Sequence, residues 1–301
     1  MINSEIKVGY LISYDYDYIK NSLPLVYDEV DYIAIAVDIN RKTWVGKSFE
    51  IPDTFFQWLK DFDKDNKIHL YEDDFCDLNL TPMQCETRER NMLSLFMGEG
   101  GWHVQIDTDE YFIDFKGFKN YVSRYMDYDT EQVLLVPFYT IFKEDNTGFF
   151  VVKDAEEYVP VAFNNPKFIR ARYTECKRTH VVPSPILHQS WAKDEVQIRK
   201  KIENWGHKND FDTEKYFQLW KFVDSYTYKR LKNLHPLAEN AWKELEYIPT
   251  TNIVELIEIL KKQDLEKRAE TAVSQKIKGS DFFPPIYYRI KRVLKRKLNR
   301  R

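Results

Sequence analysis

Two carboxylates, one residue apart, offer the clearest chemistry in this sequence. Asp107 and Asp109 belong to the motif Asp107-Thr108-Asp109-Glu110, directly after the expected buried strand Trp102–Ile106. Side chains alternate along an extended chain, so both carboxylates point to the same side. Two buried like charges need a cation or a proton for compensation, and carboxylate oxygens suit hard divalent cations. The motif therefore predicts a divalent-cation site at the end of a strand, although an Asp-x-Asp turn can also cap a helix or bind water.

The elements before this motif alternate between strands and helices. Short apolar runs predict strands, and apolar residues at helical spacing predict helices, one of which starts at Thr81-Pro82 and stops at Gly98. Strands are expected at 6–13, 31–38, 67–71 and 102–106, and helices at 16–27, 53–62 and 83–96. This order predicts an α/β fold with a mainly parallel sheet and right-handed crossovers. The motif and Asp38 then lie at the carboxyl edge of the sheet, where ligands bind.

The pattern is less regular after residue 115. Strands are expected at 132–142 and 148–153, followed by loops rich in Asn, Pro and Arg as far as about residue 185. Apolar residues at helical spacing predict a helical C-terminal extension. Its helices are expected at 194–204, 213–232 and 252–262.

The segment 286–301 is basic. It contains eight Lys or Arg and no acid, and subtracting these charges from the net −3 leaves −11 on residues 1–285. An acidic body argues against general nucleic-acid binding across the fold. In the basic segment, apolar residues share one helical face, which is typical of a helix that lies on an anionic membrane surface. The alternatives are that the segment docks on the acidic body or stays disordered.

The cysteines and the apolar segments bear on the compartment. Cys76, Cys85 and Cys176 match neither a disulfide framework nor a zinc ligand set, so we expect free thiols in a reducing cytoplasm. Charged residues interrupt the first twenty residues, and no run of eighteen apolar residues occurs. We therefore expect a cytoplasmic protein that is neither secreted nor membrane-spanning, with 286–301 as a peripheral attachment to the inner face of the membrane.

Four segments, in this order, resemble the donor-binding half of GT-A glycosyltransferases, especially the family 2 group. They are ISYD, DYIAIAVD, ETRERN at Glu86–Asn91, and GGWHVQIDTDEYF, and they cover roughly the first 115 residues. The resemblance implies a GT-A-type, Rossmann-like, mainly parallel sheet flanked by helices. It also implies a nucleotide-sugar-binding half at 1–115, an acceptor-binding half at 116–250, and C-terminal helices with the basic tail at 251–301.

The resemblance assigns donor contacts to particular residues. It implies that Tyr14 and Asp38 contact the nucleoside, although ISYDYD departs from the Pro-x-Tyr-Asn of many members. Arg90 and Asn91, with Arg88 as a helical neighbour, fall where members carry an Arg-Asn pair. Guanidinium groups suit diphosphate oxygens. The alternative is that both arginines pair with neighbouring glutamates on a solvated helix face.

The resemblance also implies a metal cofactor, Mn²⁺ or Mg²⁺. Asp107 and Asp109 would hold it against the donor diphosphate, whose negative charge grows as the glycosidic bond breaks. Many members use a late histidine as a further ligand, which falls on His188, with His180 and His207 behind it. Imidazole suits Mn²⁺ better than Mg²⁺. A lone histidine beside apolar residues is, however, more often a core residue.

Inversion at the anomeric carbon, which the family 2 resemblance implies, requires a carboxylate that takes the proton of the acceptor hydroxyl. We expect Asp194 to be this base because it lies near the expected metal loop and at a helix start, and Glu157 is the second choice. The same region also offers Asp145, Glu156 and Glu195.

The resemblance implies a metal-dependent transferase that moves a sugar from a nucleotide-sugar, a UDP-sugar, to a glycan or lipid-linked glycan acceptor in surface polysaccharide biosynthesis. Two alternatives remain open. An apolar strand followed by Asp-x-Asp also opens the haloacid dehalogenase motif, in which Asp107 would be the nucleophile of a phosphotransferase. That motif wants Thr or Val where this chain has Tyr111. The second alternative is a nucleotide-binding scaffold without turnover.

Overall fold

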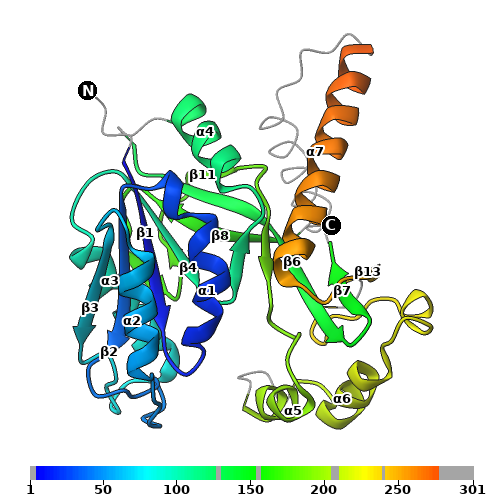
Figure 1. Ribbon diagram of the computed structural model, residues 1–301, viewed down its shortest axis with the longest axis horizontal. Helices are drawn as coiled ribbons and strands as arrows, with labels where there is room; N and C mark the ends of the chain where they lie inside the picture. The colour runs from blue at the N-terminus through cyan, green and yellow to red at the C-terminus, as the bar shows by residue number, and fades with distance from the viewer. Residues whose placement is uncertain (1–4, 127–129, 154–156, 205–209, 239–240, 278–301) are drawn as a thin grey trace.

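The computed structural model describes residues 5–126, 130–153, 157–204, 210–238 and 241–277. These residues form an α/β fold in which helices flank a mixed sheet, so the expected fold class is confirmed (Figure 1). The main path through the sheet is β13-β7-β6-β8-β4-β1-β2-β3, with β5, β11 and β12 paired beside this path.

The first part of the sheet is parallel. In it β3, β2, β1 and β4 are neighbours in that order, and all three registers are parallel. Every residue of β1 is buried, which explains its mostly apolar sequence; the one charged residue, Lys7, donates to the carbonyls of Met97, Gly98 and Glu99. The four expected strands are confirmed to within two residues, with bounds Ile6–Ile12 (β1), Tyr32–Asp38 (β2), Ile68–Asp73 (β3) and Trp102–Asp107 (β4). Their carboxyl ends meet at one edge of the sheet.

Helices α2 (Asp53–Phe62) and α3 (Pro82–Phe96) are also confirmed. Thr81 and Gln84 form a capping box at the start of α3. This helix packs closely on β1 at Gly9. A Cβ added there would lie only 2.9 Å from both Leu93 Cδ2 and Met97 Sδ. Helix α4 (Phe115–Tyr125) follows the motif.

The single helix expected at 16–27 is wrong. The chain instead forms a succession of short turns: η1 (Tyr16–Tyr18), α1 (Ile19–Ser22), η2 (Leu23–Leu25) and η3 (Tyr27–Glu29). Pro24 lies in the middle of this segment, where it removes a backbone donor and prevents a continuous α-helix.

The second part of the sheet contains strands where loops were expected. Strand β6 (Val133–Asp145) pairs antiparallel with β7 (Gly148–Val152) and with β8. The expectation of loops to about residue 185 is wrong, because the chain forms strands of two to six residues. Such short strands, separated by Pro and Asn, show no recognisable alternation. They are β8 (Tyr158–Phe163), β9 (Phe168–Arg170), β10 (Tyr173–Thr174), β11 (Thr179–Val181) and β12 (Ile186–His188).

Helices cover both faces of the β6–β7 pair. On one face, Phe142 and Phe150 pack in an apolar cluster with α5 (Glu195–Asn204) and α6 (Thr213–Phe222). On the other face, Ile141 and Val151 pack in a cluster with α7 (Ile253–Ile277). Figure 1 shows α5 and α6 apart from α7 on this side of the molecule. Strand β13 (Glu246–Ile248) extends the sheet beyond β7.

Two of the expected C-terminal helices have different lengths. The helix expected at 213–232 ends at Phe222, because Val223 is extended and Asp224 accepts backbone hydrogen bonds in the following turn. A 3-10 turn, η4 (Tyr228–Arg230), lies further on. The helix expected at 252–262 continues to Ile277.

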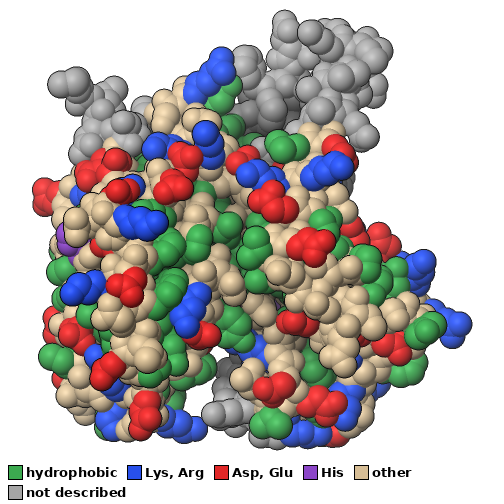
Figure 2. All heavy atoms as spheres, in the orientation of Figure 1, with side chains coloured by type: hydrophobic (Ala, Val, Ile, Leu, Met, Phe, Trp, Pro, Cys, Tyr) green, Lys and Arg blue, Asp and Glu red, His purple; other side chains and the backbone are tan. Residues whose placement is uncertain are grey.

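Several expectations concern surfaces and segments rather than elements. Figure 2 shows acidic and basic side chains interspersed over one face of the molecule. Among the described residues, no helix is long and apolar enough to cross a membrane. Cys76, Cys85 and Cys176 are free thiols. The segment 286–301, Glu156 and His207 lie outside the described residues.

Candidate active site at the carboxyl edge of the parallel strands

The Asp-x-Asp motif forms a tight turn between two strands. Strand β4 ends at Asp107, and β5 (Glu110–Phe112) begins after Thr108 and Asp109. The Asp107 amide donates to Glu110 Oε2 over 3.0 Å, so the buried Glu110 side chain closes the turn. The backbone amide of Gln189 donates to the Asp109 carbonyl over 2.9 Å, and this hydrogen bond joins the turn to the end of β12. The backbone of the motif is therefore fixed from two sides.

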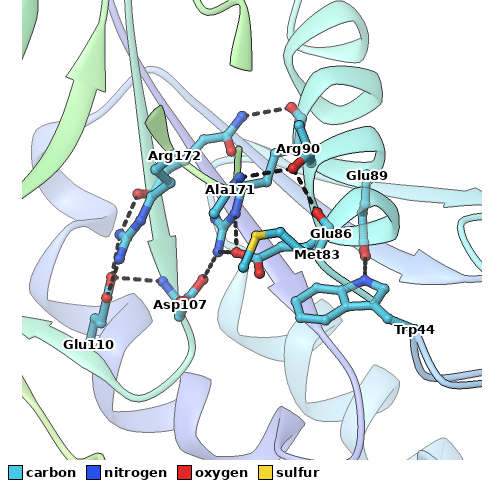
Figure 3. Close-up of polar contacts among 11 residues, drawn as sticks. Trp44, Met83, Glu86, Glu89, Arg90, Asp107, Glu110, Ala171 and Arg172 are labelled. Atoms are coloured by element: carbon cyan, nitrogen blue, oxygen red, sulfur yellow. Dashed lines mark hydrogen bonds and ion pairs between the residues drawn. The ribbon is translucent and has the colours of Figure 1, made fainter. Parts of the chain in front are cut away.

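Asp107 is held by Arg90 of α3 (Figure 3). Arg90 Nη2 lies 2.7 Å from Asp107 Oδ1 and 3.0 Å from Glu86 Oε1. Burial alone would raise the pKa of Asp107, but the charges of Arg90 and Arg172 outweigh it and keep the pKa below its ordinary value. The Arg90 side chain is 2% exposed, whereas the Asp107 side chain is 37% exposed. The carboxylate, rather than the guanidinium, is thus the accessible group, and Arg90 positions it.

Arg172 is a site residue that the sequence did not reveal. It lies between β9 and β10, next to Ala171, whose φ of 46° turns the chain sharply. Arg172 Nη1 and Nη2 donate to the two carboxylate oxygens of Glu110 at 2.7 and 2.5 Å, and Nη1 also reaches the Gln105 carbonyl. This bidentate pair neutralises Glu110 beneath the motif (Figure 3).

Asp109 faces a second set of basic side chains. Its carboxylate lies 3.5 Å from His188 Nε2 and 3.7 Å from Lys193 Nζ. Burial would raise the pKa of Asp109, but the charges of His188, Lys193 and Lys201 hold that pKa well below its ordinary value. The structure thus brings His188 to Asp109 as the sequence suggested, while Asp107 and Asp109 have separate partners.

Lys193 and Lys201 follow β12 and were also missed. Lys201 Nζ donates to the Ser190 carbonyl over 2.8 Å and to the Ser190 hydroxyl, and it lies over the Trp191 ring. Burial lowers the pKa of Lys201 to about 8, although the charge of Asp109 opposes this shift. Lys193 Nζ lies 5.1 Å from the centre of the Tyr18 ring. A spacing of eight residues, with no motif around it, gives no sequence signal for these lysines.

The loop after β1 brings a further acid to Asp109. Burial, followed by the charge of Asp109, raises the pKa of Asp15, although the Ser13 hydroxyl donates to its carboxylate over 2.9 Å. Tyr14, the expected nucleoside contact, is 69% exposed beside it. Tyr18 is partly buried, and burial with the charges of Asp109 and Asp15 raises its pKa to about 12. Tyr14 is thus free to meet a ligand, and Asp15 adds negative charge to the site.

Asp38 lies at the expected edge but is occupied by backbone groups. Its Oδ1 accepts from the amides of Asn40 and Lys42, and its Oδ2 accepts from those of Phe75 and Cys76, at 2.9 to 3.2 Å. It therefore joins the loop after β2 to the loop after β3. A direct contact of Asp38 with a nucleoside stays a prediction.

Two of the expected diphosphate contacts also hold backbone segments. Arg88 Nη1 donates to the Asp74 carbonyl over 2.6 Å, in the loop after β3. Asn91 Nδ2 donates to the Phe168 carbonyl, and the Phe168 amide donates to Asn91 Oδ1, both over 2.9 Å. These side chains join α3 to its neighbours, and their contact with a donor stays a prediction.

The two expected bases lie in different surroundings. Asp194 is exposed at the start of α5, where its Oδ1 accepts from the Gln197 amide over 2.8 Å, and its charge reaches Tyr18. Glu157 lies at the start of β8, where Trp242 Nε1 donates to its Oε2 over 3.0 Å. Asp194 thus borders the site, whereas Glu157 is engaged by the C-terminal part.

The donor set around Asp109 suits a divalent cation in type. Carboxylate and imidazole together favour Mn²⁺ over Mg²⁺. Among the described residues, however, no group of three or more His, Cys, Asp or Glu side chains is arranged to hold a metal ion. His180 pairs with Leu134 of β6, whereas His188 pairs with Thr140 of the same strand. Six residues separate these two positions, so His180 lies roughly 20 Å from His188. Asp109 and His188, with Asp107 beside them, are the protein groups that fit a cation completed by ligand oxygens.

Comparison with known proteins gives distant likenesses. No protein-family model and no curated protein sequence matches the chain. A structure of residues 1–349 of S. aureus TarS is similar with a TM-score of 0.38 and 12% identity, over 75% of this chain and 74% of that chain. A second S. aureus TarS structure has a TM-score of 0.35 and 13% identity, over 75% of this chain and 45% of that chain. Similarities at this level carry no conclusion about function, which therefore depends on the site.

Proposed function

We propose that this chain is a GT-A-type glycosyltransferase that moves a sugar from a nucleotide-sugar, a UDP-sugar, to a glycan or lipid-linked acceptor, by inversion, in surface polysaccharide biosynthesis. The observation that carries the proposal is the Asp107–Asp109 turn. It lies at the carboxyl end of β4, next to β1, with His188 and Lys193 against Asp109. This edge of a parallel sheet is where α/β enzymes bind nucleotides.

The charges around the turn support binding of a diphosphate. Asp109 and His188 would hold a Mn²⁺ or Mg²⁺ ion, with Asp107 positioned beside them by Arg90. Such an ion would stabilise the negative charge that the leaving diphosphate gains. Lys193 and Lys201 add positive charge at the same place, since both act on Asp109. Exposed Tyr14 is available to the nucleoside at the adjacent end of β1.

The test is calorimetric titration of UDP and of GDP into the protein, with and without Mn²⁺. We expect Mn²⁺-dependent binding of UDP that is lost in Asp109→Ala, because this change removes the carboxylate that faces His188. The matched control is Asp31→Ala, an exposed acid at the opposite, amino end of β2, which should bind like the wild type. If neither UDP nor GDP binds, with Mn²⁺ or without it, the proposal is overturned.

The two alternatives predict other results. A phosphotransferase that uses Asp107 as nucleophile would release phosphate from a phosphate ester such as p-nitrophenyl phosphate, and Asp107→Asn would abolish the release. The hydrogen bond from Arg90 to Asp107 Oδ1 lowers the nucleophilicity of that oxygen and disfavours this reaction. A scaffold would bind UDP without releasing it from any UDP-sugar.

A further inference from the structure

Strand β6 contains a β-bulge that the proposed donor site does not explain. Its pairing with β7 shifts between Ile141 and Lys143, so Phe142 is the extra residue. Bulges change the face to which the following side chains point and are frequent beside active sites. This one lies where the segment after β12 meets β6, since the Trp191 amide donates to the Ile141 carbonyl.

The bulge places two consecutive side chains on the same face. Phe142 packs in the cluster of α5 and α6, and Lys143 Nζ lies over Trp220 of that cluster and donates to the Val223 carbonyl. Regular alternation resumes afterwards, with Glu144 paired to Phe149. Phe149 belongs to the opposite cluster, which also contains Tyr111. The bulge therefore turns Glu144 to the face of Tyr111, whereas a regular strand would turn it away.

This face borders the Asp-x-Asp turn. The charge of Glu144 acts on the hydroxyls of Tyr18 and Tyr111, both of which also sense Asp109. The Tyr111 hydroxyl donates to Gln189 Oε1 over 2.7 Å, and the backbone amide of Gln189 donates to the Asp109 carbonyl. Glu144 thus borders the site from the second part of the chain, on the face of the sheet that carries Tyr111.

The Glu144 carboxylate has no structural task in the part of the chain that the structure describes. There, no salt bridge or hydrogen bond engages it, whereas Asp145 and Lys143 on either side both bind backbone groups. The side chain is half-buried, and this burial raises its pKa. A general base near neutral pH needs such an environment.

We propose that Glu144 is the general base that deprotonates the acceptor hydroxyl. The inference rests on the proposed transferase function and names the proton acceptor of that reaction. As the acceptor oxygen bonds to the anomeric carbon, its proton passes to a Glu144 carboxylate oxygen. The electron pair of the broken glycosidic bond leaves on the nucleoside diphosphate. Asp194, whose charge also acts on Tyr18, uses its carboxylate to cap α5.

The experiment measures release of UDP from UDP-glucose and UDP-N-acetylglucosamine with water as acceptor, together with UDP affinity by calorimetry. Glu144→Gln should lower kcat by about 10²-fold or more, the usual contribution of a general base, with KM for the donor and the affinity for UDP unchanged. Glu144→Asp should recover part of the rate, because it restores a carboxylate set back by one methylene. Glu244→Gln, an exposed acid that pairs with Lys232, is the control and should keep the wild-type rate.

Three results would overturn the inference. Wild-type kcat in Glu144→Gln would exclude the base, as would an equal loss in kcat and UDP affinity, which would indicate a role in donor binding or folding. A loss confined to Asp194→Asn, in which Asn still caps α5, would assign the base to Asp194. Failure of the wild type to bind UDP or release it would instead overturn the transferase proposal, and this inference with it.

Discussion

At the residue scale, Glu89 combines a carboxylate with an apolar environment. It is 5% exposed on α3, and Trp44 Nε1 donates to its Oε2 over 2.6 Å. Burial raises the pKa of Glu89 to about 8, although Trp44 and the charge of Arg90 oppose the shift. The folded chain therefore keeps a proton that the unfolded chain releases above its ordinary pKa of 4.5.

The free energy of unfolding should fall as pH rises from about 4.5 to about 8, since the unfolded state binds fewer protons in this window. The expected slope from Glu89 is up to ~1.4 kcal/mol per pH unit. Glu89→Gln keeps an acceptor for Trp44 and removes the titration, so urea unfolding across this range should lose this slope. Glu131→Gln, at an exposed position, should keep it. An equal slope in Glu89→Gln would contradict the prediction.

The sequence predicted the acids of the site better than their partners. Asp107 and Asp109 follow a buried strand, so their place at the sheet edge could be inferred from neighbouring residues. Arg172 and Lys193 come from segments that only the folded chain brings to the motif. The isolated carboxylates suggested a metal as their compensation, whereas the structure supplies basic side chains as well. Glu144 was missed because the bulge decides which face of the sheet its side chain points to. The sequence around Glu144 contains no signal for that bulge.

At the scale of elements, one side chain joins α3 to β9. Asn91 exchanges two hydrogen bonds with the backbone of Phe168 at the start of this strand. The hairpin of β9 and β10 in turn carries Arg172 to Glu110. Loss of the Asn91 side chain should therefore loosen the hairpin even in the absence of any ligand.

Asn91→Ala should make the amides of residues 168–174 exchange faster with solvent, since opening of the hairpin becomes easier by about 1–3 kcal/mol. Hydrogen exchange followed by mass spectrometry, without nucleotide, measures this effect. Gln57→Ala, which removes an exposed hydrogen bond on α2, is the control and should leave the hairpin unchanged. Unchanged exchange in Asn91→Ala, with weaker UDP binding, would support a direct donor contact instead.

Element prediction succeeded where each element is long and bounded by clear signals. Strands β1 and β2 consist mostly of apolar residues, and α3 begins with a capping box. The five strands between residues 158 and 188 are too short to show a period. Their pairing is non-local, because β12 bridges β5 and β6. Such contacts depend on tertiary packing that periodicity does not encode.

At the scale of the whole molecule, the charge is divided between an acidic body and the basic segment 286–301. The body carries −11 and should be repelled by an anionic bilayer, whereas the segment carries eight positive charges. Each Lys or Arg near an anionic surface contributes roughly 1 kcal/mol of attraction. We therefore expect reversible membrane attachment that depends on this segment.

The full chain should sediment with vesicles that contain phosphatidylglycerol but not with phosphatidylcholine vesicles, and a chain that ends at Ile277 should sediment with neither. Val293→Asp with Leu294→Asp tests the apolar face, since it keeps all eight basic residues. If electrostatic attraction suffices, this variant still binds and added salt releases it, because salt screens exposed charges. If insertion of the apolar face is required, it does not bind even at low salt. Equal sedimentation of the full and shortened chains would show that the basic segment does not attach the protein to membranes.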